Sequence, residues 1–385
     1  MNISLSNPDI TEKEIDHVTQ VLRTRWLSLG PKVGEFERKV AEFVGVKHAI
    51  AVNSGTSGLH LCVKALGIGK GDYVITSPFS FIASANCLLY EGAIPLFVDV
   101  LPDTYNLDPW KVEEKILHVS WNGKAPKAIV VVDIFGCPAN WDHFEEVADR
   151  FGLRLIGDSC EAFGAEYYSR KRGSWVTAGS MGDAAAFGFY PNKSMTTGEG
   201  GCIVTDNDEI ASLCRSYRNQ GRDEGGDNGR GWLHHVRLGY NYRLSDVNCA
   251  LGIAQMERIE EIMAKRCRVA GWYNERLGGV DGIHVPYAGE DVRPSWFVYV
   301  IRLDDSFESR DRDRIIREMG RRSIQCKHYF PPIHLQPFYA GEFGYQRGDF
   351  PIAEAISDRT IALPFYNNLT EEQVDCVVET LKELL

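Results

Sequence analysis

Short apolar runs that alternate with helix-like stretches constrain the fold of this chain most strongly. Residues 128–135 (AIVVVDIF) form one such run, rich in β-branched side chains. Similar runs cover residues 96–100, 153–157, 184–189 and 202–205, and another begins at residues 73–75. Strands that are apolar on both faces are typical of parallel sheets with helices on each side. We therefore predict an α/β fold with a largely parallel central sheet.

The pattern changes towards the C-terminus, which indicates a second domain. Residues 244–264 are predicted to form one long helix with Ser245 as its N-cap. After this helix we expect a strand over 296–303 and amphipathic helices over 311–319 and 371–385. We predict a large α/β domain over residues 1–262, which includes the N-terminal arm, and a smaller α+β domain over residues 263–385.

Composition and charge exclude several classes of partner. The 385 residues include 42 Lys and Arg against 53 Asp and Glu, a formal net charge of −11. Nucleic-acid-binding proteins carry a basic domain or stripe, and this sequence has no basic block, so we expect no nucleic-acid partner. Residues 1–10 lack the apolar core of a signal peptide. The apolar runs are also far shorter than the ~20 residues of a membrane span, so we expect no membrane association.

The cysteines point to a reducing compartment. Ten cysteines are scattered along the chain, and no two form a Cys-x-x-Cys pair. Zinc sites use closely spaced pairs of this kind, so we expect no metal. Several cysteines lie inside apolar runs, where the residue acts as a small hydrophobe. We therefore predict reduced core thiols in a cytoplasmic protein.

A glycine- and serine-rich segment before a predicted helix is a candidate anion site. Residues 53–58 (NSGTSG) lead into a helix predicted over 57–66. Small residues and hydroxyls at a helix N-terminus let backbone N–H groups bind a phosphate. A capped helix without a ligand shows the same residues. The spacing matches neither a Walker A loop nor the Gly-x-Gly-x-x-Gly motif of dinucleotide folds.

An aspartate and a lysine are candidate reactive groups. Asp158 directly follows the strand predicted over 153–157, so its carboxylate lies where ligands of parallel sheets bind, although it could also cap a helix. Lys193 lies in FYPNKSMTTGEGG, between an aromatic–proline turn and a Gly-Glu-Gly-Gly segment. Most lone lysines are solvated, but these flanks are apolar or small. A partly buried amine of this kind can act as nucleophile and base.

An aromatic residue completes the set. Phe81, in SPFSFIASAN, follows the strand that begins at residue 73, where its ring could stack on a flat ligand or pack into the core. Pyridoxal 5'-phosphate requires an anion cradle, a lysine for a Schiff base, a stacking aromatic and an acid beside the pyridine nitrogen. Each feature has a purely structural explanation alone, but the combination predicts this cofactor.

Longer motifs over nearly the whole chain resemble those of one enzyme family. They are TRWLSLGPKVGEFE (24–37), NSGTSGLHL (53–61), FSFIASANCLLYEGAIPLFVDV (79–100), GDSCEAFGAEY (157–167), FYPNKSMTTGEGG (189–201), LGYNYRLSDVNCALGIAQMERI (238–259) and HYFPPIHLQPFY (328–339). The chain resembles the DegT/DnrJ/EryC/StrS sugar aminotransferases, which are fold type I pyridoxal-phosphate enzymes. The resemblance implies a large domain with a mostly parallel sheet and a smaller C-terminal α+β domain.

The resemblance also implies roles for residues around the cofactor. Lys193 would bind the cofactor as a Schiff base, and Asp158 would pair with its pyridinium nitrogen. Gly55 and Thr56 would bind the phosphate, and Phe81 would stack on the ring.

Further residues would belong to a site shared between subunits. Asn241, in GYNYR, would reach the phosphate of the cofactor in the neighbouring subunit, which implies a homodimer with shared active sites. His328 and Tyr329, in HYFPPIH, would contact a nucleotide-sugar.

Two positions depart from the usual family pattern. Glu161 falls where the family often has Gln or His near the O3′ of the cofactor, and a carboxylate there would repel a phenolate unless it is protonated or bridged. Gly188, five residues before Lys193, replaces a serine that commonly donates to the phosphate. That hydrogen bond is worth about 1.5–3 kcal/mol. Ser194, Thr196, a water or a backbone N–H could replace it, or the cofactor is held more weakly.

The residues together predict a pyridoxal-phosphate enzyme. The resemblance implies an aminotransferase that moves an amino group from an amino acid, L-glutamate, to a nucleotide-linked keto-sugar for amino-sugar, polysaccharide or glycoside biosynthesis. Relatives that remove a hydroxyl carry histidine in place of Lys193, so transamination is favoured. The alternatives are another cyclic ketone as substrate, such as a cyclitol or aromatic precursor, and a non-catalytic regulatory protein that binds the cofactor. A nicotinamide oxidoreductase is disfavoured because its glycine motif is missing. The glycine-rich residues 221–231 are expected to form a mobile loop that contributes to specificity.

Overall fold

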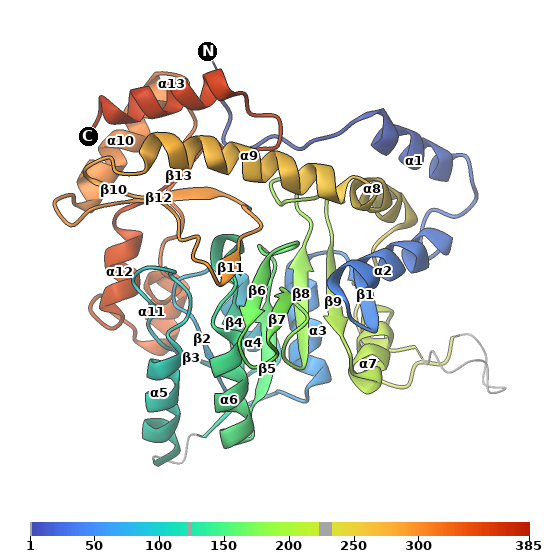
Figure 1. Ribbon diagram of the computed structural model, residues 1–385. Coiled ribbons are helices and arrows are strands. Elements are labelled where there is room, and N and C mark those ends of the chain that lie inside the picture. The colour runs from blue at the N-terminus through green and yellow to red at the C-terminus, as the bar shows by residue number, and fades with distance from the viewer. Residues whose placement is uncertain (1, 122–124, 223–232) are drawn as a thin grey trace.

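The computed structural model describes residues 2–121, 125–222 and 233–385 (Figure 1). In this part of the chain a seven-stranded sheet has the order β1-β9-β8-β5-β4-β2-β3. Its strands are β1 (His48–Val52), β2 (Tyr73–Thr76), β3 (Ile94–Phe97), β4 (Pro126–Val132), β5 (Arg154–Asp158), β8 (Ala184–Gly188) and β9 (Gly201–Thr205). From β8 to β3 neighbouring strands run parallel, whereas β9 is antiparallel to β8 and to β1. The prediction of a largely parallel sheet is confirmed.

Helices cover both faces of this sheet, which explains the uninterrupted apolar runs. Ala128 and Val130 of β4 join a core beneath α3, α4 and α7, whereas Ile129 and Val131 join the core beneath α5 and α6. These helices are α3 (Gly55–Ala65), α4 (Ala83–Leu89), α5 (Pro109–Trp121), α6 (Trp141–Phe151) and α7 (Asp208–Arg218). Because successive residues of a strand point to opposite faces, a strand between two helical layers must be apolar throughout.

Residues 244–264 form two helices instead of the single helix predicted. The first, α8 (Asp246–Met256), begins at the expected N-cap, where the Ser245 hydroxyl accepts a hydrogen bond from the N–H of Asn248 (3.1 Å). The second, α9 (Ile259–Leu277), starts after a break at Arg258, whose φ of −117° lies outside the helical range.

The break coincides with a tertiary contact. The guanidinium of Arg258 forms ion pairs with Asp9 (3.2 Å) and Glu14 (2.8 Å) of the N-terminal arm. All three residues are buried. We attribute the turn at Arg258 to this contact, which the local helical pattern does not reveal.

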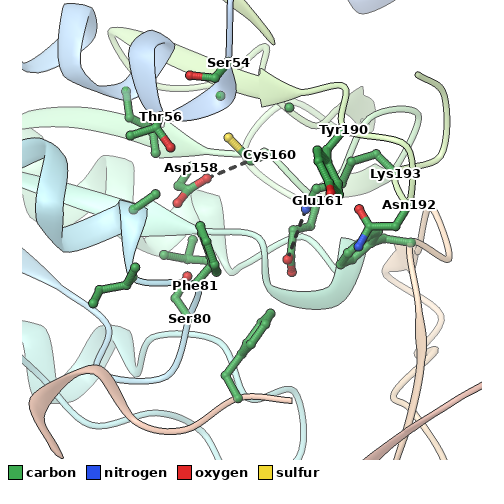
Figure 2. Close-up of a pocket in the computed structure, with 18 of the residues that line it drawn as sticks. Ser54, Thr56, Ser80, Phe81, Asp158, Cys160, Glu161, Tyr190, Asn192 and Lys193 are labelled. Atoms are coloured by element: carbon green, nitrogen blue, oxygen red, sulfur yellow. Dashed lines mark hydrogen bonds and ion pairs between the residues drawn. The ribbon is translucent and has the colours of Figure 1, made fainter. Parts of the chain in front are cut away.

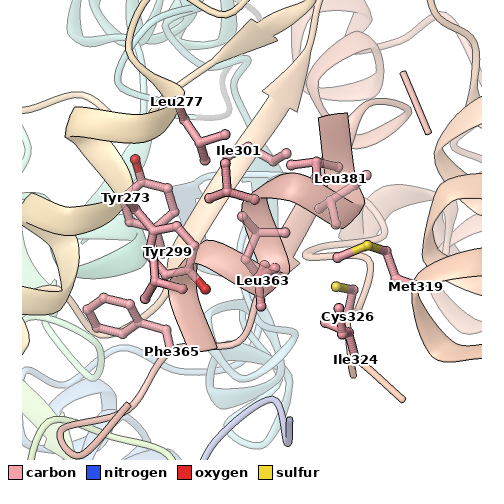
Figure 3. Close-up of a cluster of buried hydrophobic side chains, with 14 of the residues drawn as sticks. Tyr273, Leu277, Tyr299, Ile301, Met319, Ile324, Cys326, Leu363, Phe365 and Leu381 are labelled. Carbon is pink, nitrogen blue, oxygen red and sulfur yellow. The ribbon is translucent and has the colours of Figure 1, made fainter. Parts of the chain in front are cut away.

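The C-terminal part has a sheet and a core of its own. β10 (Ile283–His284), β12 (Tyr299–Leu303) and β13 (Thr360–Leu363) form an antiparallel sheet. Figure 3 shows its core, in which Tyr273 of α9 stacks on Tyr299 with ring centroids 4.6 Å apart. The predicted C-terminal helices correspond to α10 (Ser309–Arg321) and α13 (Glu371–Lys382), and the strand expected over 296–303 is β12. The predicted domain boundary at 262/263 falls within α9 and stays a prediction.

The other described elements lie outside the two sheets and the helices named above. They are α1 (Glu12–Leu22), α2 (Pro31–Val44), the short helices η1 (Ile134–Gly136), η2 (Ile333–Leu335), α11 (Pro337–Phe343) and α12 (Pro351–Ser357), and a small sheet of β6 (Glu166–Ser169), β7 (Ser174–Thr177) and β11 (Val292–Arg293). Among the described helices, none combines the length and apolar composition that crossing a membrane requires. Residues 223–231 of the predicted glycine-rich loop lie outside the described residues.

Candidate active site

A cavity of about 610 Å³ lies at the carboxyl end of the parallel strands. The predicted site residues that line it are Gly55, Thr56, Phe81, Asp158, Glu161, Lys193, His328 and Tyr329. Asn241 does not line it. The sequence motifs, which lie far apart in the chain, therefore meet in one place. Figure 2 shows Thr56, Asp158 and Phe81 on one side of this cavity and Glu161, Lys193 and Tyr190 on the other.

The N-terminus of α3 forms one wall of the cavity. Ser54 is its N-cap and accepts a hydrogen bond from the N–H of Ser57 (3.1 Å). Gly55 lies so close to β5 and β8 that a Cβ at this position would come within 2.7 Å of the Cys160 Sγ. The helix is thus capped, and its first backbone N–H groups also border the cavity. Such an end attracts anions, because N–H groups and the helix dipole act together there.

Asp158 is held at the end of β5 with its carboxylate in the cavity wall. The Ser84 hydroxyl of α4 donates to one carboxylate oxygen at 2.5 Å, and the Cys160 N–H donates to the other at 3.3 Å. The residue is 6% exposed. These bonds fix the carboxylate towards the cavity, and among the described contacts it caps no helix.

The Lys193 amine is restrained by two neighbours. Its Nζ lies 3.3 Å from Glu161 Oε1 and 3.9 Å from the centre of the Phe297 ring. The other Glu161 oxygen accepts a hydrogen bond from the Phe135 N–H (2.9 Å). Burial raises the pKa of Glu161 above its ordinary value, although Lys193 and the Phe135 N–H oppose the rise. Since its side chain is only 17% exposed, Lys193 is no solvated surface lysine.

Phe81 lies on the cavity wall and not in the core. Its 58% exposure excludes the plain core-packing interpretation. The ring lies 6.4 Å from Phe330, which in turn lies 5.5 Å from Phe135. This aromatic surface suits a flat ligand that lies against it.

The His328 side chain is neutral, and hydrogen bonds hold its ring in place. Its Nε2 lies 3.1 Å from Nη1 of Arg312 and 3.0 Å from the Ser357 hydroxyl. Because an arginine only donates, Nε2 accepts and the proton resides on Nδ1. Burial, with Arg312 nearby, lowers the pKa of His328. The adjacent Tyr329 is half-buried, and burial raises the pKa of its phenol.

Gly188 stands where the resemblance leads us to expect a serine, and a Cβ would fit there. A Cβ at Gly188 would meet its nearest neighbour, the Cys160 carbonyl oxygen, at 3.4 Å, an ordinary contact. The hydroxyl of Thr196 donates to the Phe189 carbonyl (3.0 Å), and neither Thr196 nor Ser194 lines the cavity. Neither hydroxyl therefore replaces the missing serine at this wall.

Sequence reasoning missed two of the restraining residues. Ser84 lies at the start of α4, three positions after Phe81. Residues at this spacing share a face of a helix, so the position of Phe81 could have indicated that Ser84 also faces the cavity. Phe297 comes from the C-terminal part of the chain, just before β12, and no local pattern marks it.

Comparison with known proteins identifies the family of this chain. The model of the DegT/DnrJ/EryC1/StrS aminotransferase family matches residues 8–382. The chain belongs to this family. Family members among curated proteins include GDP-perosamine synthase from Caulobacter vibrioides, 39% identical over 100% of this chain and 98% of that protein. The spore coat polysaccharide biosynthesis protein SpsC from Bacillus subtilis is 36% identical over 99% and 96% of the two chains.

Solved structures of the same family share the fold. Helicobacter pylori PseC, an aminotransferase involved in the biosynthesis of pseudoaminic acid, aligns with a TM-score of 0.91 and 27% identity over 100% of this chain and 99% of that one. The PLP-form of the putative sugar aminotransferase Spr1654 from Streptococcus pneumoniae aligns with a TM-score of 0.90 and 27% identity over 100% and 98%. The protein is therefore a fold type I enzyme of the aminotransferase class.

Proposed function

We propose that the cavity binds pyridoxal 5'-phosphate, with the phosphate at the N-terminus of α3 and Lys193 bonded to the cofactor. One observation carries this proposal: the N-terminus of α3, a fixed carboxylate and a restrained lysine amine line the same cavity. The residues present fit the group, because Gly55 brings the α3 backbone to the wall and Phe81 offers an aromatic face. When bound, this cofactor supplies a carbonyl that exchanges amines and a ring that accepts electrons.

In this proposal Asp158 and Lys193 divide the proton chemistry. Asp158, whose carboxylate accepts a hydrogen bond from the Ser84 hydroxyl, would pair with the protonated ring nitrogen of the cofactor. The Lys193 amine, freed if an incoming amine replaced it on the cofactor, would act as general base and then acid: it would take a proton from the amine-bearing carbon of the donor and deliver it to the carbonyl-derived carbon of the cofactor. Glu161 Oε1 lies 3.3 Å from this amine and can accept a hydrogen bond from it.

We further propose that the acceptor is a nucleotide-linked keto-sugar and that the donor is an amino acid, L-glutamate. GDP-perosamine synthase and PseC are named for steps in sugar metabolism, which supports a sugar acceptor. His328 and Tyr329 are proposed to contact this acceptor. His328 offers a neutral ring and Tyr329 a phenol at the cavity wall.

We propose that the enzyme is a homodimer and that Asn241 contacts the phosphate held by the other copy. Asn241 is exposed and lies outside the cavity of its own chain, as this arrangement requires. All ten cysteines are free, which supports a cytoplasmic location.

A substrate screen tests the proposed activity. The cofactor-loaded protein is incubated with L-glutamate and a panel of 3-keto and 4-keto nucleotide-sugars, with cyclitol ketones as comparison, and the products are measured by mass spectrometry. We expect amino-sugar and 2-oxoglutarate in equal amounts, and none with Lys193→Ala. Conversion of the cyclitol ketones alone would overturn the acceptor, and an alternative donor with inert glutamate would overturn the donor.

A further inference from the structure

A partly buried polar cluster outside the cavity joins α3 to the chain segment that carries Asn241. We call Glu91, His60, Lys64, Tyr240 and Tyr242 the Glu91 cluster. Glu91, in the turn after α4, accepts a hydrogen bond from the Tyr240 hydroxyl (2.7 Å) and lies 2.8 Å from His60 Nε2. Lys64 Nζ lies 3.0 and 2.9 Å from the two Glu91 oxygens.

The aromatic rings of the cluster are also packed against one another. Tyr240 and Tyr242 stack at 4.9 Å with their planes 11° apart, and the His60 ring lies 4.8 Å from Tyr240. His60 Nδ1 lies 3.1 Å from the Tyr242 hydroxyl. Only 3% of the His60 side chain and 16% of the Glu91 side chain are exposed. Buried networks in which each member has its partners hold their members in one arrangement.

The same contacts fix the position of Asn241. The backbone of the Tyr240–Tyr242 segment is held at both ends, because the Tyr240 carbonyl accepts from the Gln220 N–H (2.8 Å) and the Tyr242 carbonyl accepts from the Asn53 N–H (3.0 Å). In an extended segment alternate side chains point to opposite faces. With both tyrosines on the cluster, the exposed Asn241 side chain is presented on the other face.

The cluster also connects this segment to the anion-binding helix. His60 and Lys64 belong to α3, whose N-terminus at Gly55 borders the cavity of the same chain. Asn53, which bonds the Tyr242 carbonyl, directly precedes the Ser54 cap. The N-terminus of α3, which borders the cavity of its own chain, and the Asn241 amide, which lies outside that cavity, are therefore held together in one unit.

We propose that Glu91 is a positioning residue for the cofactor site of the second copy in the dimer. It holds the Tyr240–Tyr242 segment on α3 so that the Asn241 amide meets the phosphate bound by the partner. This inference rests on the proposed function, and within it on the role of Asn241.

Cofactor affinity tests the proposal. Glu91→Gln and the control Glu145→Gln are prepared without cofactor and titrated with pyridoxal 5'-phosphate, and the visible absorption is followed. Glu145 is a matched control because it also pairs with cations, Lys171 and Arg172, and is 13% exposed, but it lies on α6. We expect Glu91→Gln to bind the cofactor about three- to tenfold more weakly, part of the value of one hydrogen bond to an anion, and Glu145→Gln to bind like the wild type.

Mixed dimers show in which site Glu91 acts. In the first, a wild-type chain is paired with a Lys193→Ala, Glu91→Gln chain, so the only site with Lys193 receives Asn241 from the substituted chain. In the second, a Glu91→Gln chain is paired with a Lys193→Ala chain, so that site receives Asn241 from an intact cluster. We expect weakened binding in the first dimer and wild-type binding in the second.

The outcomes separate this inference from the proposed function. A wild-type protein that binds no pyridoxal 5'-phosphate overturns both. Weakened binding in the second mixed dimer alone overturns the inference, because Glu91 would then act on its own cradle. Unchanged affinity, or loss of the dimer by light scattering, also overturns it. If Glu91→Gln does not fold, Tyr240→Phe removes the hydroxyl that donates to Glu91 and keeps the ring stack, with the same expected weakening.

Discussion

Single residues around the cavity are restrained before any ligand arrives. Asp158 is held by Ser84 and by the Cys160 N–H, and the Lys193 amine lies between Glu161 and Phe297. Groups fixed in this way need less reorganisation when charge develops during a reaction. Gly188 differs, because it lines the cavity without a side chain that could bind a ligand.

Gly188→Ser is expected to strengthen cofactor binding. A Cβ at this position makes only ordinary contacts, and its hydroxyl could donate to the phosphate at α3. A hydrogen bond to an anion is worth about 1.5–3 kcal/mol, so the dissociation constant should fall about tenfold or more. Absorbance titration of the cofactor-free protein measures this change. Gly188→Ala is the control and should match the wild type; an equal gain with alanine would exclude the hydroxyl as the cause.

Residues that line the cavity could be predicted from the sequence better than the residues that hold them in place. Lys193, Asp158 and Gly55 stand in motifs whose composition reflects their surroundings, since small flanks let backbone and side chains approach a ligand. Ser84 and Phe297 act through contacts between elements distant in sequence. The chemical roles assigned to all these residues stay predictions, including those of His328 and Tyr329, which line the cavity, and of Asn241, which does not.

Among the elements, strands were predictable and the division of the long helix was not. The strand β5 was expected over 153–157 and lies at Arg154–Asp158, because burial on both faces leaves a clear apolar signature. The break between α8 and α9 depends on Arg258, which contacts the N-terminal arm some 250 residues earlier. The spacing of apolar residues in a helix does not reveal a contact with a residue as distant in sequence as Asp9.

Arg258→Ala is expected to destabilise the fold and to change its response to acid. The substitution leaves the buried carboxylates of Asp9 and Glu14 without their shared cation, which should cost about 3–5 kcal/mol in the free energy of unfolding. Burial alone would raise the pKa of Asp9, but Lys265, Asn368 and Arg258 hold it below its ordinary value. Glu14 is likewise lowered, despite burial, by Thr11 and Arg258.

The sign of the acid effect follows from these shifts. Carboxyl groups with lowered pKa values stabilise the fold above their unfolded pKa, and this stability is lost as the pH falls. The free energy of unfolding of the wild type, measured by urea titration, should therefore decrease as the pH falls from about 5 to about 3. Arg258→Ala should show a shallower dependence over the same range. Equal slopes in the two proteins would contradict the assigned role of Arg258.

At the scale of the whole molecule, exposed apolar side chains gather along the chain near Asn241. Leu233, Val236 and Leu238 are 55%, 43% and 78% exposed. Trp26 is 61% exposed, and Ser28 close to it pairs with Ser245, four residues beyond Asn241. Exposed apolar surface of this kind marks interaction sites. It supports the proposed dimer, in which Asn241 faces the second copy.

Leu238→Glu is expected to disrupt the dimer and to weaken cofactor binding together. A charge placed in an apolar interface must be desolvated without a partner. Light scattering should show a monomer at concentrations where the wild type is dimeric, and the titration should show a higher dissociation constant. Leu117→Glu, on an exposed position of α5, is the control and should change neither. A Leu238→Glu protein that stays dimeric would place the interface elsewhere.

The most direct test of the account is to find where the cofactor bonds to the chain. The protein is loaded with pyridoxal 5'-phosphate, reduced with borohydride, digested, and examined by mass spectrometry. We predict a single cofactor adduct on Lys193, and none when L-glutamate is added before reduction, because the amino acid frees the lysine. An adduct on another lysine, or no adduct after loading, would contradict the account.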